Sequence, residues 1–446
     1  MSNTVLSIES LDLSAQGVAH DDEGKVVFVE GALPGEKVRV EFSRHKKNYN
    51  KAQVVEVLQA SPLRVTPRCP YFGQCGGCVM QHLDADAQIA IKQRALEDML
   101  RHIGRVQAAQ ILPPIYGAFW GYRMKARFSA RFVAKKGGML VGFRERNSRF
   151  VMDMEHCQVV PPHVSALLKP LRALLETLSV ARRVPQIELA VGDAQTVLVL
   201  RHLEPLSAED HDKLRQFAQE HQIQWWLQPK GPETAHPLEA DQEDLYYSLP
   251  EYDLQMHFKP TDFTQVNHGI NRVLIRRALA LLDIQPHHRV VDLFCGLGNF
   301  TLPIARTARE VVGVEGSEVL IERARAAAQK HDLADRAQFS VLDLFQVDEE
   351  WLQTLGHFDR MLIDPPRDGA VAVAKAVSAL PVQAQPERIV YVSCNPSTLA
   401  RDAGILTHVG GYRLQAAGVV NMFPHTAHIE SIAVFTKGTQ ERLSID

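Results

Sequence analysis

The sequence predicts an α/β protein of three parts: a small N-terminal β-barrel, a central α+β region and a C-terminal Rossmann-like, doubly wound domain. The chain has 446 residues, and at roughly 150 residues per domain this length suggests about three domains. Short β-rich segments fill residues 4–60, and strand and helix patterns alternate from about residue 263 onward. The alternation is typical of a doubly wound sheet. We place the three parts at residues 1–66, 67–260 and 261–446.

The first part reads as about five short strands separated by the turn-like stretches HDDEGK and LPGE. This number of strands in so few residues fits an OB-like barrel, a fold that often binds nucleic acid. Residues 44–52 are expected to form an exposed basic loop between two of the strands. Tyr49 lies within this loop and is suited to stacking on a base.

The central part begins with a helical pattern at residues 79–105, in which one face is formed by Ile89, Leu96, Met99, Leu100 and Ile103. Residues 119–151 alternate like two paired strands with a Lys-Lys-Gly-Gly turn between them. Residues 204–253 are acidic and contain prolines, and we interpret them as connecting or peripheral structure.

The charges are distributed unevenly, although the formal net charge is only −3. From Phe42 to Phe150 there are 19 basic and 6 acidic residues, a local net charge of +13 that leaves −16 on the rest of the chain. The densest part, Lys92 to Arg149, has 13 basic and 3 acidic residues. Such a segment can neutralise phosphates, so we expect it to face nucleic acid. A basic face that is merely solvated is the alternative.

No stretch of about 18 apolar residues is found, which argues against a membrane span, and the N-terminus lacks the features of a signal peptide. We therefore expect a cytoplasmic protein, in which six cysteines serve as metal ligands or catalytic groups rather than disulfides. Cys69, Cys75 and Cys78 follow the spacing C-x5-C-x2-C, and Cys157 comes later. Four thiolates suit zinc or a four-iron cluster, and the spacing leaves both open.

The third part opens with RVVDLFCGLGNF, an apolar strand followed by a glycine turn. Gly296 and Gly298 permit a tight turn and close approach of a ligand. Thr301 stands where a dinucleotide-binding loop has its third glycine, so a smaller nucleoside cofactor is favoured. The next strands end in Glu315, Asp343 and Asp364. Acids at successive strand ends line the ligand crevice of an open α/β sheet, and Glu315 is placed to bind ribose hydroxyls.

These motifs together resemble the RNA 5-methyluridine methyltransferases. The resemblance rests on DLFCGLGNF, on IDPPR, on YVSCNPSTLARD, on MFPHTAHIES and on the four clustered cysteines, and it covers essentially the whole chain. It implies a class I methyltransferase domain that uses S-adenosylmethionine, a TRAM-like barrel and a [4Fe–4S] cluster held by Cys69, Cys75, Cys78 and Cys157. Because barrel and cysteines are both present, the chain is most similar to the branch that acts on uracil C5 in 23S rRNA.

The chemistry of this family requires a thiol that adds to C6 of uracil and a base that removes the C5 proton. Cys394, which follows the apolar strand RIVYVS, is the expected nucleophile. Glu430 is the expected base, with His425 and His428 as competitors. Asp364 is expected to hydrogen-bond the uracil imide. Catalytic and cofactor contacts are expected from a set of residues at the strand ends and loops: Cys394, Glu430, Asp364, Gln265, Phe294, Gly296, Gly298, Asn299, Glu315 and Asp343.

The resemblance implies an enzyme whose partner is 23S rRNA, without a membrane or an obligate protein partner and in monomeric form. The target uridine would be turned out of its stack to reach Cys394. Three alternatives remain: action on another 23S rRNA site or on tRNA, methylation of cytosine C5, and a non-catalytic RNA-binding assembly factor. Cys295, in the cofactor turn, has no assigned chemistry.

Overall fold

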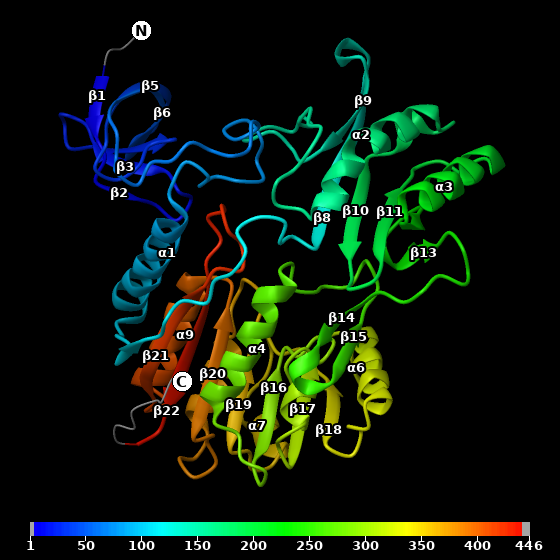
Figure 1. Ribbon diagram of the computed structural model, residues 1–446. Helices are drawn as coiled ribbons and strands as arrows, with labels where there is room; N and C mark the ends of the chain where they lie inside the picture. Colours follow the sequence, from blue (N-terminus) through cyan, green and yellow to red (C-terminus); the bar gives the residue numbers. More distant parts are fainter. Residues whose placement is uncertain (1–3, 439–446) are drawn as a thin grey trace.

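The computed structural model describes residues 4–438, and Figure 1 shows their arrangement. The N-terminal strands form a six-stranded sheet in the order β1-β5-β6-β4-β3-β2, one strand more than expected. Alternate side chains such as Val27, Val29, Val38 and Val40 point into its core, as period-two strands require. The strands are β1 (Thr4–Ser7), β2 (Ser10–Leu11), β3 (Gly17–His20), β4 (Val26–Glu30), β5 (Lys37–His45) and β6 (Tyr49–Gln59).

The predicted basic loop is shorter than expected, because β5 and β6 extend into it and leave only residues 46–48 as the connection. Tyr49 is the first residue of β6, and its ring packs edge-on against Phe28 with 5.5 Å between centroids. The ring is therefore half-buried in the barrel rather than free in a loop.

The central sheet has the order β13-β12-β11-β10-β8-β9. The predicted strand pair is confirmed as β8 and β9, which pair antiparallel around the Lys-Lys-Gly-Gly turn. The strands are β8 (Lys125–Val133), β9 (Gly138–Gly142), β10 (Gln186–Val191), β11 (Thr196–Arg201), β12 (Gln224–Gln228) and β13 (His236–Pro237). Helices α2 (Pro162–Thr177) and α3 (Ala208–His221) pack beside this sheet (Figure 1).

The interpretation of residues 204–253 as peripheral structure is wrong. This segment contains α3 and strand β12, which pairs parallel with β11 inside the sheet. Trp225 of β12 has no exposed surface, and Leu214 of α3 is equally buried. The acidic residues mask this role because most of them are exposed, although Asp210 is buried, while the few apolar residues of the amphipathic helix α3 enter the core.

The C-terminal sheet has eight strands in the order β18-β17-β16-β19-β20-β22-β21-β7, and its alternation of strands and helices confirms the doubly wound prediction. Its strands are β7 (Gln110–Ile111), β16 (Arg289–Leu293), β17 (Glu310–Glu315), β18 (Ala337–Val341), β19 (Arg360–Ile363), β20 (Arg388–Ser393), β21 (Arg413–Val420) and β22 (Glu430–Thr436). The helices of this region are α4 (His268–Leu282), α5 (Thr301–Ala305), α6 (Glu318–Lys330), α7 (Glu349–Thr354), α8 (Val371–Ala379) and α9 (Pro396–His408).

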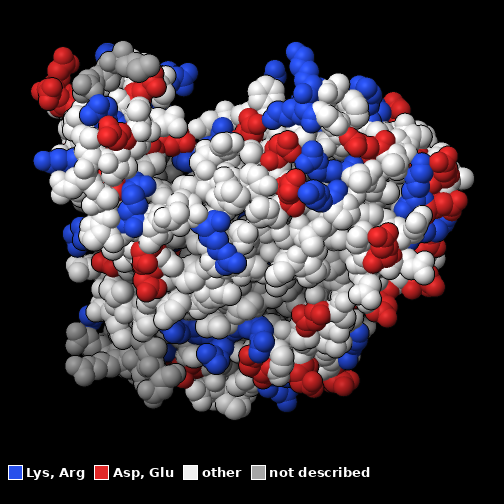
Figure 2. All heavy atoms as spheres, turned by 45° about the horizontal axis from the view of Figure 1, so that its top comes forward, with Lys and Arg blue, Asp and Glu red and all other residues white. Residues whose placement is uncertain are grey.

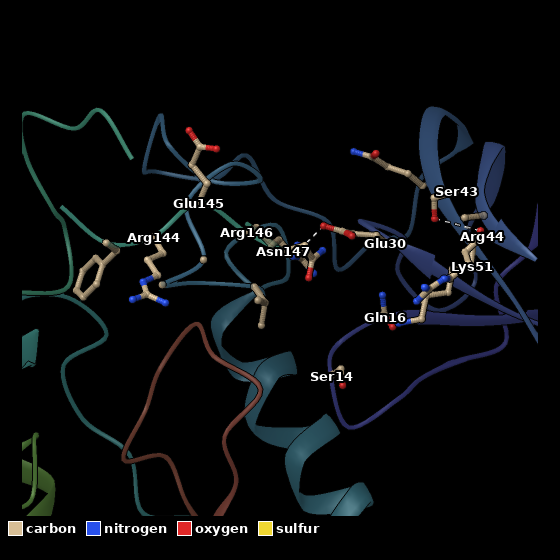
Figure 3. Close-up of a pocket in the computed structure, with 16 residues that line it drawn as sticks. Ser14, Gln16, Glu30, Ser43, Arg44, Lys51, Arg144, Glu145, Arg146 and Asn147 are labelled. Carbon is tan, nitrogen blue, oxygen red and sulfur yellow. Dashed lines mark hydrogen bonds and ion pairs between the residues drawn. The ribbon is translucent and has the colours of Figure 1, made fainter. Parts of the chain in front are cut away.

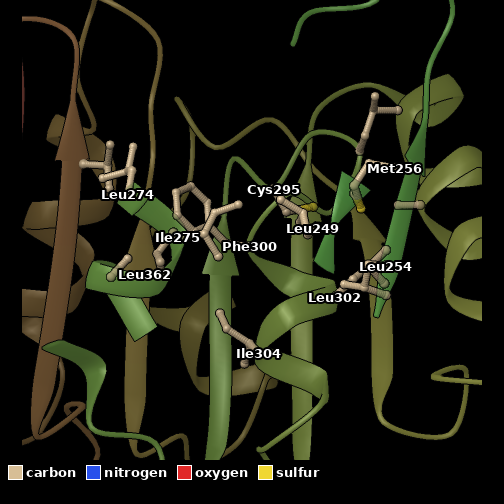
Figure 4. Packing of buried hydrophobic residues seen from close by; sticks show 14 of the residues in the cluster. Leu249, Leu254, Met256, Leu274, Ile275, Cys295, Phe300, Leu302, Ile304 and Leu362 are labelled. Atoms are coloured by element: carbon tan, nitrogen blue, oxygen red, sulfur yellow. The ribbon is translucent and has the colours of Figure 1, made fainter. Parts of the chain in front are cut away.

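One face of this sheet is covered by α4 and by the hairpin of β14 (Tyr246–Leu249) and β15 (Leu254–His257). Figure 4 shows Leu249, Leu254 and Met256 of the hairpin packing toward Leu302 and Ile304 of α5. The apolar core therefore joins the hairpin to the helix that follows the glycine turn, and it fixes the turn at the sheet edge.

Helix α1 (Ala85–Met99) confirms the predicted helical pattern and continues into a π-helical turn at Leu100–Gly104. Ile89, Leu96 and Leu100 are buried in the same cluster as the C-terminal strands, whereas Ile103 is 47% exposed. Strand β7 pairs with β21. Both elements come early in the chain yet pack on the C-terminal sheet (Figure 1).

None of the helices within residues 4–438 is long and apolar enough to cross a membrane. The predicted outer limits of the first and third parts include residues 1–3 and 439–446, which lie outside the described residues.

Candidate active site

A cavity of about 510 Å³ opens at the carboxyl edge of the C-terminal sheet. Strands β16 to β20 are parallel, so their carboxyl ends meet at this edge, and ligands bind in such a crevice where the strand order reverses. The reversal is at β16, which lies between β17 and β19. The cavity brings together all but one of the predicted catalytic and cofactor residues: Gln265, Phe294, Gly296, Asn299, Glu315, Asp343, Asp364, Cys394 and Glu430.

The glycine turn confirms the tight conformation expected for the loop after β16. Gly296 and Gly298 both have positive φ, +55° and +86°, in the left-handed region that favours glycine. The backbone N–H of Gly296 donates to a Glu315 carboxylate oxygen at 3.2 Å, and Ser317 N–H donates to the other oxygen at 3.1 Å. Gly298 does not line the cavity, so it shapes the turn without facing a ligand.

The Asn299 side chain lines the cavity but is already engaged. Its amide oxygen accepts hydrogen bonds from the Tyr247 hydroxyl and from the Asn271 amide, each at 2.9 Å, and its amide nitrogen donates to Asn271 at 3.0 Å. This network ties the turn to the β14–β15 hairpin and to α4.

Cys394, Asp364 and Glu430 reach one end of the cavity from three elements. Asp364 follows β19 and Cys394 follows β20. Because β22 runs antiparallel to β20 with Ser393 opposite Ser431, the first residue of β22 lies at the same edge as the last residue of β20. The strand register therefore brings Glu430 to Cys394, although 36 positions separate them in the sequence.

Burial makes this end of the cavity unfavourable for negative charge. Burial, and then the charges of Glu430 and Asp364, raise the pKa of Cys394 to about 11, while Arg367 opposes the rise. Burial raises the pKa of Asp364 to about 7. Burial and the charge of Asp364 hold the pKa of Glu430 well above its usual value.

The two histidines considered as competing bases lie in different places. His428 lines the cavity and its Nδ1 is 3.1 Å from a guanidinium nitrogen of Arg367. His425 has positive φ, +65°, and its ring stacks on Trp120 with 4.0 Å between centroids. It does not line the cavity, so within the described residues only His428 of this pair can reach a bound base.

Several cavity-lining side chains were not predicted. Phe263 is 77% exposed, and the others include Tyr247, Phe345, Arg367 and Phe423. The sequence contained a signal for two of these residues. Phe263 comes two residues before Gln265, and Arg367 directly follows the proline pair. Tyr247 and Phe345 come from distant segments, and no local pattern marks them.

The four clustered cysteines also meet. Cys69, Cys75, Cys78 and Cys157 line one small cavity together with Phe143 and Met154, and all four are free thiols. Within residues 4–438, no group of three or more His, Cys, Asp or Glu side chains is arranged to hold a metal ion. The structure thus confirms the convergence of the thiols and does not show a metal centre.

A larger hollow of about 950 Å³ lies between the barrel and two stretches of the central region. These stretches are residues 69–80, the cysteine-bearing segment, and residues 143–147. Figure 3 shows Arg44 and Lys51 on the barrel side and Arg144 and Arg146 on the other side. Arg146 pairs with Glu30 at 2.8 Å across the hollow. Figure 2 shows basic side chains on both lobes of this face and many acidic ones at its right-hand edge. The hollow therefore presents basic side chains to which a polyanion can bind.

A doubly wound sheet with a crevice at its carboxyl edge and a thiol beside it is the arrangement expected of the class I methyltransferase domain that the sequence predicts. Over 97% of this chain and 100% of the other, the fold matches a solved Pyrococcus abyssi tRNA (uracil-54, C5)-methyltransferase in complex with S-adenosyl-L-homocysteine. The TM-score is 0.73 and the sequence identity 23%.

The chain belongs to the tRNA (Uracil-5-)-methyltransferase family, whose model matches residues 84–438. A TRAM domain model matches residues 5–55, which confirms the predicted type of barrel. A protein of Bordetella bronchiseptica named 23S rRNA (uracil(1939)-C(5))-methyltransferase RlmD is 62% identical over 97% of this chain and 92% of its own length. A protein of Cupriavidus necator with the same name is 58% identical over 97% of this chain and 100% of its own length.

Proposed function

We propose that this protein transfers a methyl group from S-adenosylmethionine to C5 of a uridine in 23S rRNA, the position numbered 1939 in the names of its relatives. The observation that carries the proposal is the convergence of Cys394, Asp364 and Glu430 at one end of a cavity whose other residues form a nucleoside crevice. We expect the enzyme to work in the cytoplasm as a monomer.

Cys394 is the nucleophile of this mechanism. C5 of uracil is a weak nucleophile, and addition of the Cys394 thiolate to C6 converts the ring into an enolate that is nucleophilic at C5. S-adenosylmethionine, when bound, supplies the electrophilic methyl group that C5 attacks. Asp364, at the same end of the cavity, hydrogen-bonds the imide and keeps the ring in place.

Glu430 completes the reaction by removing the proton from C5, after which the C6–S bond breaks and the thiolate leaves. A carboxylate in a buried site is a stronger base than one in water, because burial favours its protonated form. The raised pKa of Glu430 makes its carboxylate a stronger base, and the step requires this carboxylate to be ionised when the C5 proton leaves. His428, which is paired with Arg367, is the alternative base.

The cofactor is held by the loops at the strand ends. Glu315 is positioned by two backbone N–H groups to receive ribose hydroxyls, Asp343 and Phe294 flank the adenosine, and Gln265 contacts the cofactor through its amide. Asn299 contributes mainly by fixing the turn, since Tyr247 and Asn271 occupy its side chain.

We propose further that the RNA crosses the hollow between the barrel and residues 143–147. Arg44, Lys51 and Arg144 line it and are suited to phosphate contacts. A TRAM domain on one side and the cysteine-bearing segment on the other would hold the rRNA while the target uridine enters the cavity.

The four cysteines are proposed to hold a [4Fe–4S] cluster, with zinc as the alternative. Support comes from the donor set, four free thiols that line one cavity. The proposed role is structural, because methyl transfer needs no electron transfer. The iron, zinc and acid-labile sulfide content of the purified protein decides between them, since a cluster gives about four iron and four sulfide per chain.

A covalent trap tests the catalytic assignment. The enzyme and S-adenosylmethionine are incubated with a 23S rRNA fragment containing 5-fluorouracil, in which C5 carries no proton to remove. The wild type is expected to form an adduct that survives denaturation, and Cys394→Ala is expected to form none. No adduct with any 23S fragment, or an adduct with a tRNA instead, would overturn the rRNA assignment.

The role of Glu430 has its own test on ordinary RNA. Glu430→Gln is expected to accumulate the adduct because elimination requires that base. Normal turnover by this variant would transfer the role to another residue, with His428→Ala as the next variant to measure.

A further inference from the structure

The connection between β21 and β22, residues 421–429, forms one wall of the active-site cavity. Phe423 and His428 line the cavity, and the connection ends at Glu430. Its conformation therefore determines where His428 lies, and it leads directly into Glu430, which the pairing of β22 holds. Residues between 79 and 122 hold this connection, because they contact it at successive positions.

Lys92 of α1 makes the first of these contacts. Its side chain is buried, with 2% exposure. The ammonium group donates to the Asn421 amide oxygen and to the Phe423 carbonyl, each at 2.9 Å. Among the ion pairs of residues 4–438, none involves Lys92. Burial lowers the pKa of Lys92 to about 7, because a buried cation is costly unless it is well hydrogen-bonded. The side-chain nitrogen therefore depends on these two oxygens staying where they are.

Further hydrogen bonds hold the next two residues, Pro424 and His425. The Tyr122 hydroxyl donates to the Pro424 carbonyl at 2.9 Å. The His425 N–H donates to the Gln88 amide oxygen at 2.9 Å. The His425 carbonyl accepts from the N–H groups of Val79 and Met80, at 2.8 and 3.0 Å, and Val79 directly follows Cys78.

A short chain of hydrogen bonds leads from Lys92 to the cavity. The Phe423 carbonyl that receives the ammonium group also accepts from the Thr426 hydroxyl at 3.0 Å. The Thr426 oxygen in turn accepts from His428 N–H at 3.3 Å. The His428 ring lies 5.3 Å from the Phe423 ring between centroids. The Phe423 carbonyl and the Thr426 hydroxyl thus connect Lys92 to the backbone of His428, whose side chain lines the cavity.

We propose that Lys92 is a positioning residue, which clamps residues 421–423 to helix α1 and so holds His428 and Glu430 in the geometry that resolves the covalent adduct. The inference rests on the proposed function. It also assigns a second task to the cysteine-bearing segment, whose Val79 and Met80 hold the same connection through His425.

The test compares Lys92→Met with the wild type on a 23S rRNA fragment. Methionine retains most of the apolar stem and loses the donors. Because a misplacement of about 1 Å can cost about a hundredfold in rate, we expect adduct resolution to slow by about that factor. The fraction of enzyme held as adduct should rise, while the affinity for S-adenosylhomocysteine stays within about twofold. Global destabilisation would instead lower the amount of active enzyme without changing the adduct fraction.

Lys213→Met is the control for the loss of a lysine that donates to a backbone carbonyl, because Lys213 of α3 donates to that of Thr177 at 2.8 Å. Lys213 also pairs with Glu209 and lies outside the cavity, so this variant should leave the adduct fraction unchanged. If Lys92→Met fails to fold, Tyr122→Phe removes one hydrogen bond from the same connection and should raise the adduct fraction to a smaller extent. An unchanged adduct fraction in a folded variant would overturn the proposal. Failure of the wild type to methylate the fragment would instead overturn the proposed function.

Discussion

Cys394 lies in surroundings that oppose the ionisation on which its proposed reactivity depends. Apolar burial and two neighbouring carboxyl groups raise the pKa of its thiol, and Arg367 is the cation that opposes them. Such a site keeps the free enzyme in the unreactive thiol form, and it disfavours the thiolate unless bound substrate changes the neighbouring charges.

A pH profile follows from this arrangement. Because the pKa of Cys394 is raised to about 11, the thiolate fraction of the free enzyme increases about tenfold per pH unit through the neutral range. Adduct formation in single-turnover experiments should therefore accelerate from about pH 6 to 9. Glu430→Gln removes a carboxyl group that raises the thiol pKa, so its profile should move to lower pH. A flat wild-type profile would contradict the assignment.

Phe263 is the residue for which exposure itself is informative. A phenylalanine that is 77% exposed and lines the cavity offers a face for stacking, and stacking on one base is worth about 1–3 kcal/mol. Phe263→Ala is expected to raise KM for the RNA by about tenfold or more, whereas Phe263→Tyr should retain most of the affinity. Titration of KM for the rRNA fragment measures both variants, and equal losses in them would exclude stacking.

The resemblance to the methyltransferase family implied that Cys394, Asp364 and Glu430 belong to one site, and all three line one cavity in the structure. The sequence could not predict the hydrogen bonds that occupy Asn299, nor that His425 and His428 diverge. Those outcomes depend on the hairpin and on a positive φ at His425, which tertiary packing determines.

At the scale of elements, the decisive feature is the antiparallel strand β22 between β20 and β21. The pattern of apolar residues predicts that β20 and β22 are strands, but it does not predict their order or register. The same limit explains the misinterpretation of residues 204–253, where α3 and β12 contribute only a few buried side chains such as Trp225.

The cysteine-bearing segment supports the wall of the basic hollow as well as the catalytic connection. Gly77 and Phe143 line both the thiol cavity and the hollow, and Gly76 N–H donates to the Arg144 carbonyl at 2.9 Å. Loss of the thiol site should therefore disturb the hollow before it disturbs the distant cofactor turn.

Cys75→Ala tests this coupling. RNA binding is expected to weaken by about tenfold, which corresponds to about 1.4 kcal/mol, while the dissociation constant for S-adenosylhomocysteine should change little. Filter binding and calorimetry measure the two affinities. Equal losses would indicate general unfolding rather than a local change at the hollow.

At the scale of the whole molecule, the net charge of −3 is the sum of a basic segment at residues 42–150 and an acidic remainder. The basic segment was visible in the sequence as a count of residues, but the hollow was not, since Arg44 and Arg144 come from different parts of the chain and meet only in the fold. The domain limits at 66/67 and 260/261 stay predictions, and α1 shows that packing does not follow them closely, because it lies on the C-terminal sheet.

Salt dependence measures how many phosphates the hollow neutralises. Each phosphate contact contributes roughly 0.7–0.9 to the slope of the logarithm of affinity against the logarithm of salt concentration. Lys51→Ala and Arg144→Ala should each reduce the slope by about that amount and leave methyl transfer at saturating RNA unchanged. Lys213→Ala, on α3, is the matched control and should leave the slope unaltered. If all three variants keep the wild-type slope, the RNA backbone follows another path across the protein, and the proposal for the hollow is wrong.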